Sequence, residues 1–270
     1  MKYVPKDIRD APNPNVTPTH PLKELIVLLS GALGCIVGAY IVLGFLVDWV
    51  VPKISFETEE KMAALFAPLD LQRDGSTDVE RRLQAMVDEI QDSCTHLPYT
   101  ISVSVADEPM INAVALPGGR IVVFQGLLEN VRSENEIAFI LGHEMGHFAN
   151  RDHLRGLGRG LVLLVVSTAL FGADSSVSDL IADTITITEM SFSRAQETRA
   201  DEYGLEVLNC SFGHVTGATD FFEKIPKESD PGRFGHYFSS HPENQRRIAR
   251  LKRIAEEKKF PEGRRIPWEE

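Results

Sequence analysis

Two histidines and a glutamate fall within five residues in the middle of the chain, in the order His143-Glu144-Met145-Gly146-His147. Side chains four residues apart project from the same face of an α-helix, so both imidazoles can reach a single ion. Glu144 lies beside them and is placed to take a proton from the attacking water. The spacing therefore predicts a hydrolytic site with one Zn²⁺ per chain and a carboxylate as general base.

Two imidazoles and a water leave a tetrahedral zinc site one ligand short, and spacing alone leaves two candidates. His153 stands ten residues after His143, as in the metzincins, and Met190 could serve as the methionine-turn residue. Glu197 is the other candidate, on a second predicted helix where Asp201 follows four residues later and could orient an imidazole. A solvated face of charged side chains is the alternative for this acidic pair.

Capping signals define the helices that must hold these residues. Ser133 and Glu136 match a capping box directly before the two histidines, and Thr77 and Glu80 match another further upstream. Apolar residues then recur at helical spacing, which predicts a buried stripe on each helix. The stripe of the first helix is Ile137, Ile140, Leu141 and Phe148, and that of the second is Leu83, Met86, Val87 and Ile90.

Strand signals lie between the two helices. Residues 100–106 alternate between polar and apolar, and Pro117-Gly118-Gly119 separates two β-branched runs, residues 111–116 and 120–124, as a hairpin turn would. We therefore expect an α+β fold, mainly helical with a small antiparallel sheet. One hairpin strand should form a sheet edge beside the histidine helix, where an extended substrate could pair. Asn112 could contact that substrate or serve the end of the strand.

Residues 25–47 carry no charge and, at about 1.5 Å per residue, span roughly the 30 Å hydrocarbon layer. Trp49 follows where an interfacial aromatic belongs. A cleaved signal peptide, a lipoprotein site at Cys35 and a buried core helix fit less well. The sequence thus predicts a Pro-rich tail (1–24), a transmembrane helix (25–49) and one metallopeptidase domain (55–270).

Basic residues set the expected orientation of that helix. Four precede the apolar run and only two follow it closely, which predicts a cytoplasmic N-terminus and an extracytoplasmic catalytic domain. These residues are Lys2, Lys6, Arg9 and Lys23 before it, and Lys53 and Lys61 after it. A second apolar run, residues 160–173, would make only about 21 Å of helix. We expect a buried helix there, with a hairpin dipping into the bilayer as the alternative.

The net charge of −11 argues against nucleic acid as a main partner. Cys94 and Cys210 belong to no CxxC pair, so a thiolate zinc knuckle is not expected. They could form a disulfide if the domain is exported, but two unpaired buried thiols are the favoured interpretation. A zinc hydrolase with one cysteine ligand is a further alternative, without a ligand motif to support it.

Several separated segments, between Pro98 and Leu251, resemble the membrane-associated zinc metallopeptidases that include the CAAX prenyl protease, the bacterial heat-shock protease HtpX and the mitochondrial Oma-type protease. The matching segments keep the order of that family. They are Asn112-Ala113, Pro117-Gly118-Gly119, Gly126-Leu127-Leu128, Glu134 to His147, Ser193-Arg194 with Glu197, Ala200 and Asp201, and His241-Pro242 with Arg247-Ile248. A single predicted span resembles the Oma-type and periplasmic members more than the multi-span ones.

The resemblance implies a zincin-type domain with His143, His147 and Glu197 as zinc ligands and Asp201 as the supporting acid. It places His241 near the site, where this histidine could donate to the oxyanion or cap the final helix. Arg194 and Arg247 are expected to pair with carboxylates as scaffold.

These observations predict a membrane-anchored zinc metalloendopeptidase that acts on proteins in envelope quality control. A catalytically silent, metal-binding chaperone or scaffold of the same fold is the alternative. The intact Glu144 argues against it, because a silent relative has no chemical need for a base there. Neither hypothesis specifies the substrate sequence or the oligomeric state.

Overall fold

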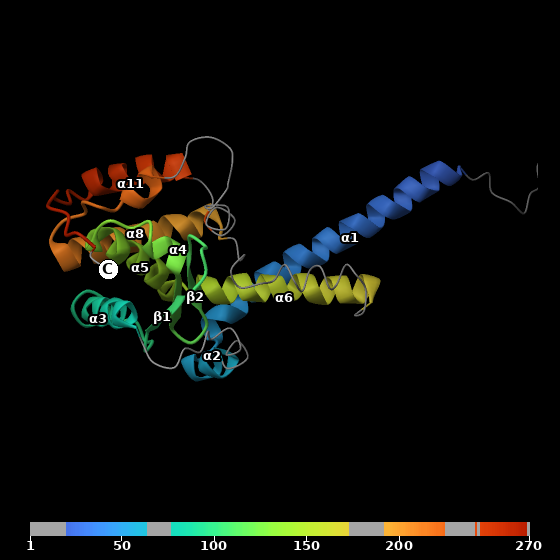
Figure 1. The fold of residues 1–270 in the computed structure, drawn as a ribbon. Helices are drawn as coiled ribbons and strands as arrows, with labels where there is room; N and C mark the ends of the chain where they lie inside the picture. The colour runs from blue at the N-terminus through green and yellow to red at the C-terminus, as the bar shows by residue number, and fades with distance from the viewer. Residues whose placement is uncertain (1–19, 64–76, 173–191, 225–240, 242–243, 269–270) are drawn as a thin grey trace, which may run out of the picture. The chain divides into compact units, whose positions relative to one another are not determined.

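The structure is a computed structural model, and it describes residues 20–63, 77–172, 192–224, 241 and 244–268 (Figure 1). The chain divides into two compact units, Met1–Val42 and Leu43–Glu270. The helices are α1 (Pro21–Val50), the 3-10 turn η1 (Val51–Lys53), α2 (Phe56–Ala63), α3 (Asp78–Ser93), α4 (Gln125–Leu128), α5 (Glu134–Ala149), α6 (Asp152–Phe171), α8 (Arg194–Phe212), α9 (Asp220–Glu223) and α11 (Asn244–Glu257).

Helix α1 contains the predicted apolar run and has no buried residue. Its large side chains, such as Leu28 and Phe45, are exposed along the helix. The uncharged stretch of α1, residues 25–47, is apolar all round and matches a lipid environment better than water. Two helical segments, Pro21–Lys53 and Asp152–Leu170, are long and apolar enough to cross a membrane by length and composition.

The second unit is organised around α5, which packs along α8. Small residues allow this close approach: a Cβ at Gly142 would lie 3.0 Å from Val207, and one at Gly146 would lie 2.9 Å from the Cα of Ala200. Helix α3 covers the pair, with Leu83, Val87 and Ile90 buried as predicted and Met86 partly buried. The backbones of the two helices that carry the candidate ligands therefore lie in direct contact.

The three strands are β1 (Ser102–Ala106), β2 (Ala113–Leu116) and β3 (Arg120–Phe124), in the order β1-β3-β2. The predicted hairpin is present, because β2 and β3 pair antiparallel across a turn in which Gly118 and Gly119 both have positive φ. Strand β1 pairs parallel with β3, so the sheet is mixed rather than wholly antiparallel. Of the strands that the structure describes, β2 is an outer one, and it packs on α5 as expected.

Helix α6 corrects the expectation that residues 160–173 form a buried helix. Its outer half, residues 161–170, exposes large apolar side chains. Leu161 is 46% exposed and Val165 64%, and Leu163 and Leu170 are also exposed. The inner half is packed, with Leu154 and Leu157 buried. A run of apolar residues has the same composition in a protein core and in lipid, so the sequence did not separate the two environments.

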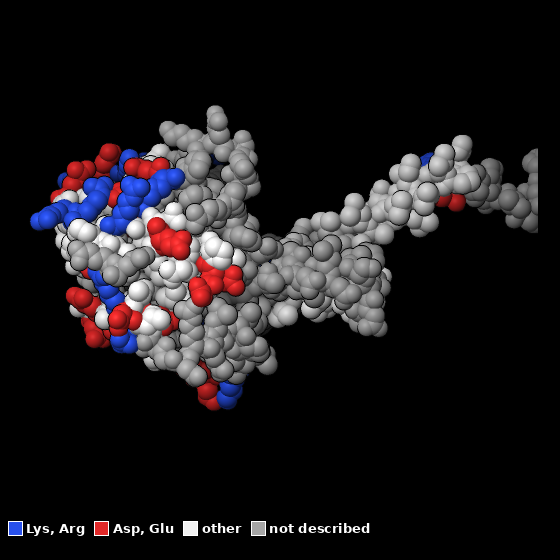
Figure 2. All heavy atoms as spheres, viewed as in Figure 1, with Lys and Arg blue, Asp and Glu red and all other residues white. Residues whose placement is uncertain are grey.

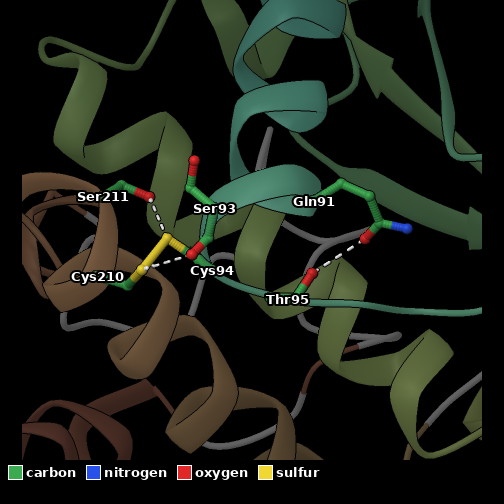
Figure 3. The surroundings of a disulfide bond; sticks show 6 residues. All are labelled: Gln91, Ser93, Cys94, Thr95, Cys210 and Ser211. Atoms are coloured by element: carbon green, nitrogen blue, oxygen red, sulfur yellow. Dashed lines mark hydrogen bonds between the residues drawn. A yellow bond between two sulfur atoms is a disulfide. The ribbon is translucent and has the colours of Figure 1, made fainter.

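The favoured interpretation of the cysteines was also wrong: Cys94 and Cys210 form a disulfide that joins the end of α3 to the end of α8 (Figure 3). Ser211 Oγ lies 3.6 Å from Cys94 Sγ. The bond closes 116 residues of chain, which is expected to stabilise the fold by about 4–5 kcal/mol in the chain-entropy account. It also removes both cysteines as zinc ligands.

Helix α11 completes this unit as an amphipathic element. Leu251 and Ile254 are buried, whereas Lys252 and Arg253 are exposed. Figure 2 shows Lys and Arg side chains gathered over this helix. One arginine of α11, Arg247, is instead buried and faces the candidate site.

Candidate metal centre

Helix α5 brings the two predicted histidines together. It begins at Ser133, whose side chain accepts a hydrogen bond from Glu136 N, while the Glu136 carboxylate accepts from Arg132 N. Only one of the two bonds of the predicted capping box therefore forms. The Glu136 carboxylate bonds the backbone N–H of Arg132 instead of that of Ser133. One helical turn separates His143 and His147, and their Nε2 atoms lie 3.2 Å apart.

Helix α8 presents Glu197 to the same point. Ser193 and Gln196 form a full capping box there, so Glu197 stands in the first helical turn. Its Oε1 lies 3.5 Å from His147 Nε2, and its Oε2 lies 3.8 Å from His143 Nε2. All three side chains are buried.

His241 joins this group from a distant part of the chain. Its Nδ1 lies 2.9 Å from Glu197 Oε1 and 3.4 Å from His143 Nε2, and its Nε2 lies 3.8 Å from Glu144 Oε1. Among the described residues, the potential ligand atoms of His143, His147, Glu197 and His241 all lie within 4.8 Å of one another. These contacts bring His241 to the site, where the resemblance placed it.

The donor set fits a zinc ion. A tetrahedral site with bonds of about 2.0–2.1 Å has ligand atoms about 3.3 Å apart, close to the 3.2, 3.5 and 3.8 Å separations found here. Nitrogen and carboxylate oxygen are ligands that zinc accepts. Glu144 is also buried, and within the described part of the chain its Oε2 has no hydrogen-bond partner. Such an atom is suited to a water or a substrate group.

A separate carboxylate supports each histidine of α5. Asp201 Oδ1 lies 3.2 Å from His143 Nδ1, which agrees with the supporting role expected for this acid. Asp152 Oδ2 lies 3.3 Å from His147 Nδ1. A bond at Nδ1 fixes the ring and leaves Nε2 for a metal.

Sequence reasoning missed Asp152. It is the first residue of α6, directly after Arg151, whose φ of 54° is left-handed. The left-handed Arg151 interrupts the helix and turns the chain so that Asp152 lies beside His147. The helical periodicity of α5, continued past Ala149, does not predict this contact. Its second oxygen accepts a hydrogen bond of 2.9 Å from Gln196 Nε2 on α8.

Arg247 ties the acids of α8 together, in agreement with its expected scaffold role. Its Nε donates to both oxygens of Asp201, at 2.8 and 3.0 Å, and its Nη1 lies 2.9 Å from Glu197 Oε2. Arg250 Nη2 adds a 3.0 Å bond to Asp201. Arg194 is exposed at the start of α8.

Burial and charge set opposite protonation preferences along α5. Burial and the Arg247 guanidinium lower the pKa of His143 to about 3. Burial alone would lower the pKa of His147, but hydrogen bonds to Asp152 and Glu197 outweigh it and raise that pKa to about 9. The carboxylates that favour a proton on His147 would equally favour a metal cation beside it.

The two glutamates of the site also differ. Burial would raise the pKa of Glu197, but His241 and Arg247 hold it well below its usual value. Burial dominates at Glu144 and raises its pKa. Glu197 is therefore an ionised, ligand-like carboxylate, while Glu144 has the raised proton affinity that suits a base.

The other ligand candidate is turned elsewhere. His153 Nε2 lies 2.7 Å from Glu59 Oε1 on α2, so it belongs to a separate buried ion cluster. Met190 lies outside the described residues. Asn112 lies directly before β2, where its Oδ1 accepts from Ala113 N and its carbonyl accepts from Phe124 N.

A ring unforeseen in the sequence also touches the site. Phe192 stacks on His147 with centroids 3.8 Å apart and an interplanar angle of 16°. Phe192 is buried and directly precedes the cap of α8. The stacking limits rotation of the His147 ring in addition to the bond from Asp152.

Comparison with known proteins agrees with this geometry. Residues 75–255, more than half of the chain, match peptidase family M48. The mitochondrial metalloendopeptidase OMA1 of Arabidopsis thaliana is 34% identical over 146 residues, which cover 54% of this chain and 30% of that protein. OMA1 of Danio rerio is 31% identical over 195 residues, which cover 66% of this chain and 40% of that protein.

A bacterial relative matches over a larger share of its own length. The metalloprotease LoiP of Escherichia coli is 26% identical over 182 residues, which cover 66% of this chain and 71% of LoiP. The chain spans less than half the length of the two OMA1 relatives.

Proposed function

Because the chain belongs to peptidase family M48, we propose that it is a membrane-anchored zinc-dependent metalloendopeptidase that hydrolyses peptide bonds in proteins. The observation that carries this proposal is the convergence of three ligand-type side chains on one point beside the buried carboxylate of Glu144. The relatives are known as metalloendopeptidases or metalloproteases, which supports the same reaction.

We assign His143, His147 and Glu197 as the zinc ligands. When bound there, zinc supplies a Lewis acid that polarises the substrate carbonyl and lowers the pKa of water. Asp201 and Asp152 hold the two imidazoles so that each Nε2 faces the ion. The donor atoms are already grouped at tetrahedral spacing, so little rearrangement is needed for binding.

Glu144 is the general base in this proposal. Burial raises its pKa, so its carboxylate can accept the proton of the attacking water and return it to the leaving amine. His241 Nε2 faces Glu144 at 3.8 Å. Its Nδ1 lies 2.9 Å from Glu197 Oε1, and we assign its Nε2 the role of stabilising the oxyanion.

The edge strand β2 is the proposed docking line for substrate. Among the described strands it is the outer one, paired with β3 and packed on α5, and its four residues are buried. An extended peptide added to that edge would gain backbone hydrogen bonds without a strong sequence requirement. A protease that clears misfolded envelope proteins would need such tolerance.

The anchor is the second part of the proposal. Residues 25–49 span the bilayer and residues 55–270 form the catalytic domain. Of the expected tail, residues 1–19 lie outside the described residues, and its last residues already belong to α1, which begins at Pro21. The basic bias around the span places the N-terminus in the cytoplasm. The Cys94–Cys210 disulfide supports an extracytoplasmic catalytic domain, because disulfides persist in oxidising compartments.

The test is cleavage of unfolded casein by the purified, zinc-loaded chain, with and without a chelator. We expect the wild type to cleave, chelation to stop it, and Glu144→Gln to lower the rate by at least about a hundredfold. Glu257→Gln, on the exposed face of α11, is the matched control and should retain full activity. Equal cleavage by the wild type and Glu144→Gln would refute the hypothesis that the chain is a zinc endopeptidase. Capture of casein by the wild type without cleavage would support the catalytically silent chaperone.

A further inference from the structure

A polar pocket of about 360 Å³ lies at the base of α6, on the opposite side of Asp152 from the metal centre. We call it the arginine pocket, because Arg155, Arg159 and Arg199 line it together with Asp48. Asp48 in the lining and the buried Asp152 beside it pair with these three guanidinium groups, which leaves an excess of one positive charge in a chain whose net charge is −11. The pocket is therefore a local exception to the acidic balance of the protein.

The three guanidinium groups remain accessible to a ligand. The side chains of Arg155, Arg159 and Arg199 are 22%, 38% and 47% exposed. Within the described part of the chain, the bonds of Arg159 run through Nη2 to Asp48, at 3.0 and 3.2 Å. Since a guanidinium carries five N–H donors in a planar fork, donors remain for a phosphate.

The arginine pocket lies at the membrane end of this unit. Asp48 belongs to the last turn of α1 and Arg155 Nε lies 3.5 Å from it. The backbone of α6 comes close to the same turn, because a Cβ at Gly158 would lie 2.7 Å from Val47 Cγ1. These contacts place Arg155 and Arg159 where α1 leaves the predicted hydrocarbon layer.

Directly beyond the arginines, α6 becomes apolar and exposed. Leu161, Leu163, Val165 and Leu170 are all exposed. The stretch from residue 161 to residue 170 rises about 14 Å, roughly half of a 30 Å hydrocarbon layer. Helix α6 thus has arginines at its base and exposed apolar side chains beyond them. This order matches one leaflet of a bilayer, in which a polar headgroup layer is followed by acyl chains.

We propose that the arginine pocket binds the phosphate of an anionic phospholipid headgroup while the outer half of α6 lies among the acyl chains of the same leaflet. The inference rests on the proposed membrane anchoring of the chain. Along α6, arginines that suit the headgroup phosphate are followed by apolar side chains that suit the acyl chains. A phospholipid therefore fits this helix better than a free anion. Arginine suits this role, since its fork binds phosphate oxygens in pairs.

The first experiment measures headgroup recognition by the full-length, zinc-loaded chain in a neutral detergent. Dihexanoyl phosphatidylglycerol is titrated and the shift in Tm is followed, with dihexanoyl phosphatidylcholine and inorganic phosphate as separate arms. We expect phosphatidylglycerol to raise Tm more than either. Arg199→Gln should weaken the apparent affinity about tenfold, whereas Arg253→Gln on α11 should not change it.

Each outcome decides the matter. Equal shifts with inorganic phosphate would replace the lipid with a free anion, and equal shifts with phosphatidylcholine would remove headgroup recognition. Loss of binding in Arg253→Gln as well would reduce the effect to general surface charge. Casein cleavage by the same samples shows separately whether the proposed protease activity is present.

The second experiment tests the acyl contact. Val165→Trp is placed in nanodiscs whose lipids carry bromine on the acyl chains, and its quenching is compared with that of Arg253→Trp above the background of Trp49 and Trp268. We expect added quenching for the Val165→Trp variant only. Unquenched fluorescence from the indole introduced by Val165→Trp would place the outer half of α6 outside the acyl layer and overturn the proposal.

Discussion

The two histidines of α5 occupy the same helix face, yet their surroundings differ. His143 is supported from α8 and α11, where Asp201 is held by the buried Arg247 and by Arg250. His147 is supported from the start of α6, where Asp152 is shared with Gln196 and with Arg199, whose Nη2 lies 3.4 Å away. One side is closed within the protein, and the other leads to the partly exposed arginine pocket.

The two sides of the metal centre therefore have different roles, one in setting charge and one in fixing position. The α11 side sets the charges: burial and the Arg247 guanidinium lower the pKa of His143, while His241 and the same guanidinium hold the pKa of Glu197 well below its usual value. The α6 side fixes position, and its partners continue towards the membrane end of the unit. The predictions below test the comparison in order of decreasing effect.

The ligand that both sides share should be the most sensitive position. Glu197→Ala removes the only carboxylate of the proposed ligand set, so we expect stoichiometric zinc to be lost. Mass-spectrometric metal analysis after dialysis measures this directly. His153→Ala is the matched control and should retain its zinc, because its Nε2 bonds Glu59 rather than the centre. The reverse result would establish the metzincin arrangement.

Next in size is the loss of the buried guanidinium on the α11 side. Arg247→Met would leave Glu197 and Asp201 buried without their main counter-charge, which typically costs about 3–5 kcal/mol. Urea unfolding of the metal-free protein measures that loss. Arg250→Gln, which removes a partly exposed partner of the same acid, should cost much less. Equal effects of the two substitutions would contradict the scaffold role of Arg247.

The supporting acids offer the sharpest contrast between the sides. Asp152→Asn and Asp201→Asn should each weaken zinc binding about 10- to 100-fold, because each removes the carboxylate that fixes one imidazole. Only Asp201→Asn should also lower the free energy of unfolding strongly, since it removes a carboxylate partner of the buried Arg247. Asp152, by contrast, pairs with Arg155 and Arg199, which are partly exposed. Competition with a chelator and urea unfolding separate the two readouts. Wild-type zinc affinity in Asp152→Asn would remove its assigned role.

The residues of the metal centre also differ in how well the sequence predicted them. His143 and His147 were predictable because helical spacing and a cap are local features. Glu197 was not settled by spacing, since His153 fitted nearly as well until the resemblance was considered. Asp152 could not be predicted, because it reaches His147 only through the left-handed Arg151.

The fold shows the same limit. The capping box at Thr77, the helical stripes and the glycine turn of the hairpin are local signals, and they were correct, while the box at Ser133 is half formed. The parallel pairing of β1 with β3, the Cys94–Cys210 disulfide and the exposed half of α6 depend on tertiary contacts or solvent. Alternation, cysteine spacing and apolar composition do not encode these.

The smallest expected effect concerns the cluster that fixes the start of α6. Glu59 on α2 is buried and bonds Arg151, His153 and Tyr99, at 2.8, 2.7 and 3.0 Å. Burial would raise the pKa of Glu59, but the bonds from His153 and Arg151 outweigh it and lower that pKa to about 2. The cluster thus holds α2 against the turn that delivers Asp152.

The sign of the pH effect follows from this lowered pKa. The unfolded chain binds a proton at Glu59 near its ordinary pKa of 4.5, while the folded chain resists it down to about pH 2. The stabilisation is complete above about pH 4.5 and is lost as the pH falls towards 2, by about 1.4 kcal/mol per pH unit. Glu59→Gln should therefore show a shallower loss of stability across this window. Urea unfolding at several pH values measures the slope, and Glu57→Gln, exposed on the same helix, should leave it unchanged. Parallel slopes for the wild type and Glu59→Gln would show that this cluster does not hold the α6 side in place through an ionised carboxylate.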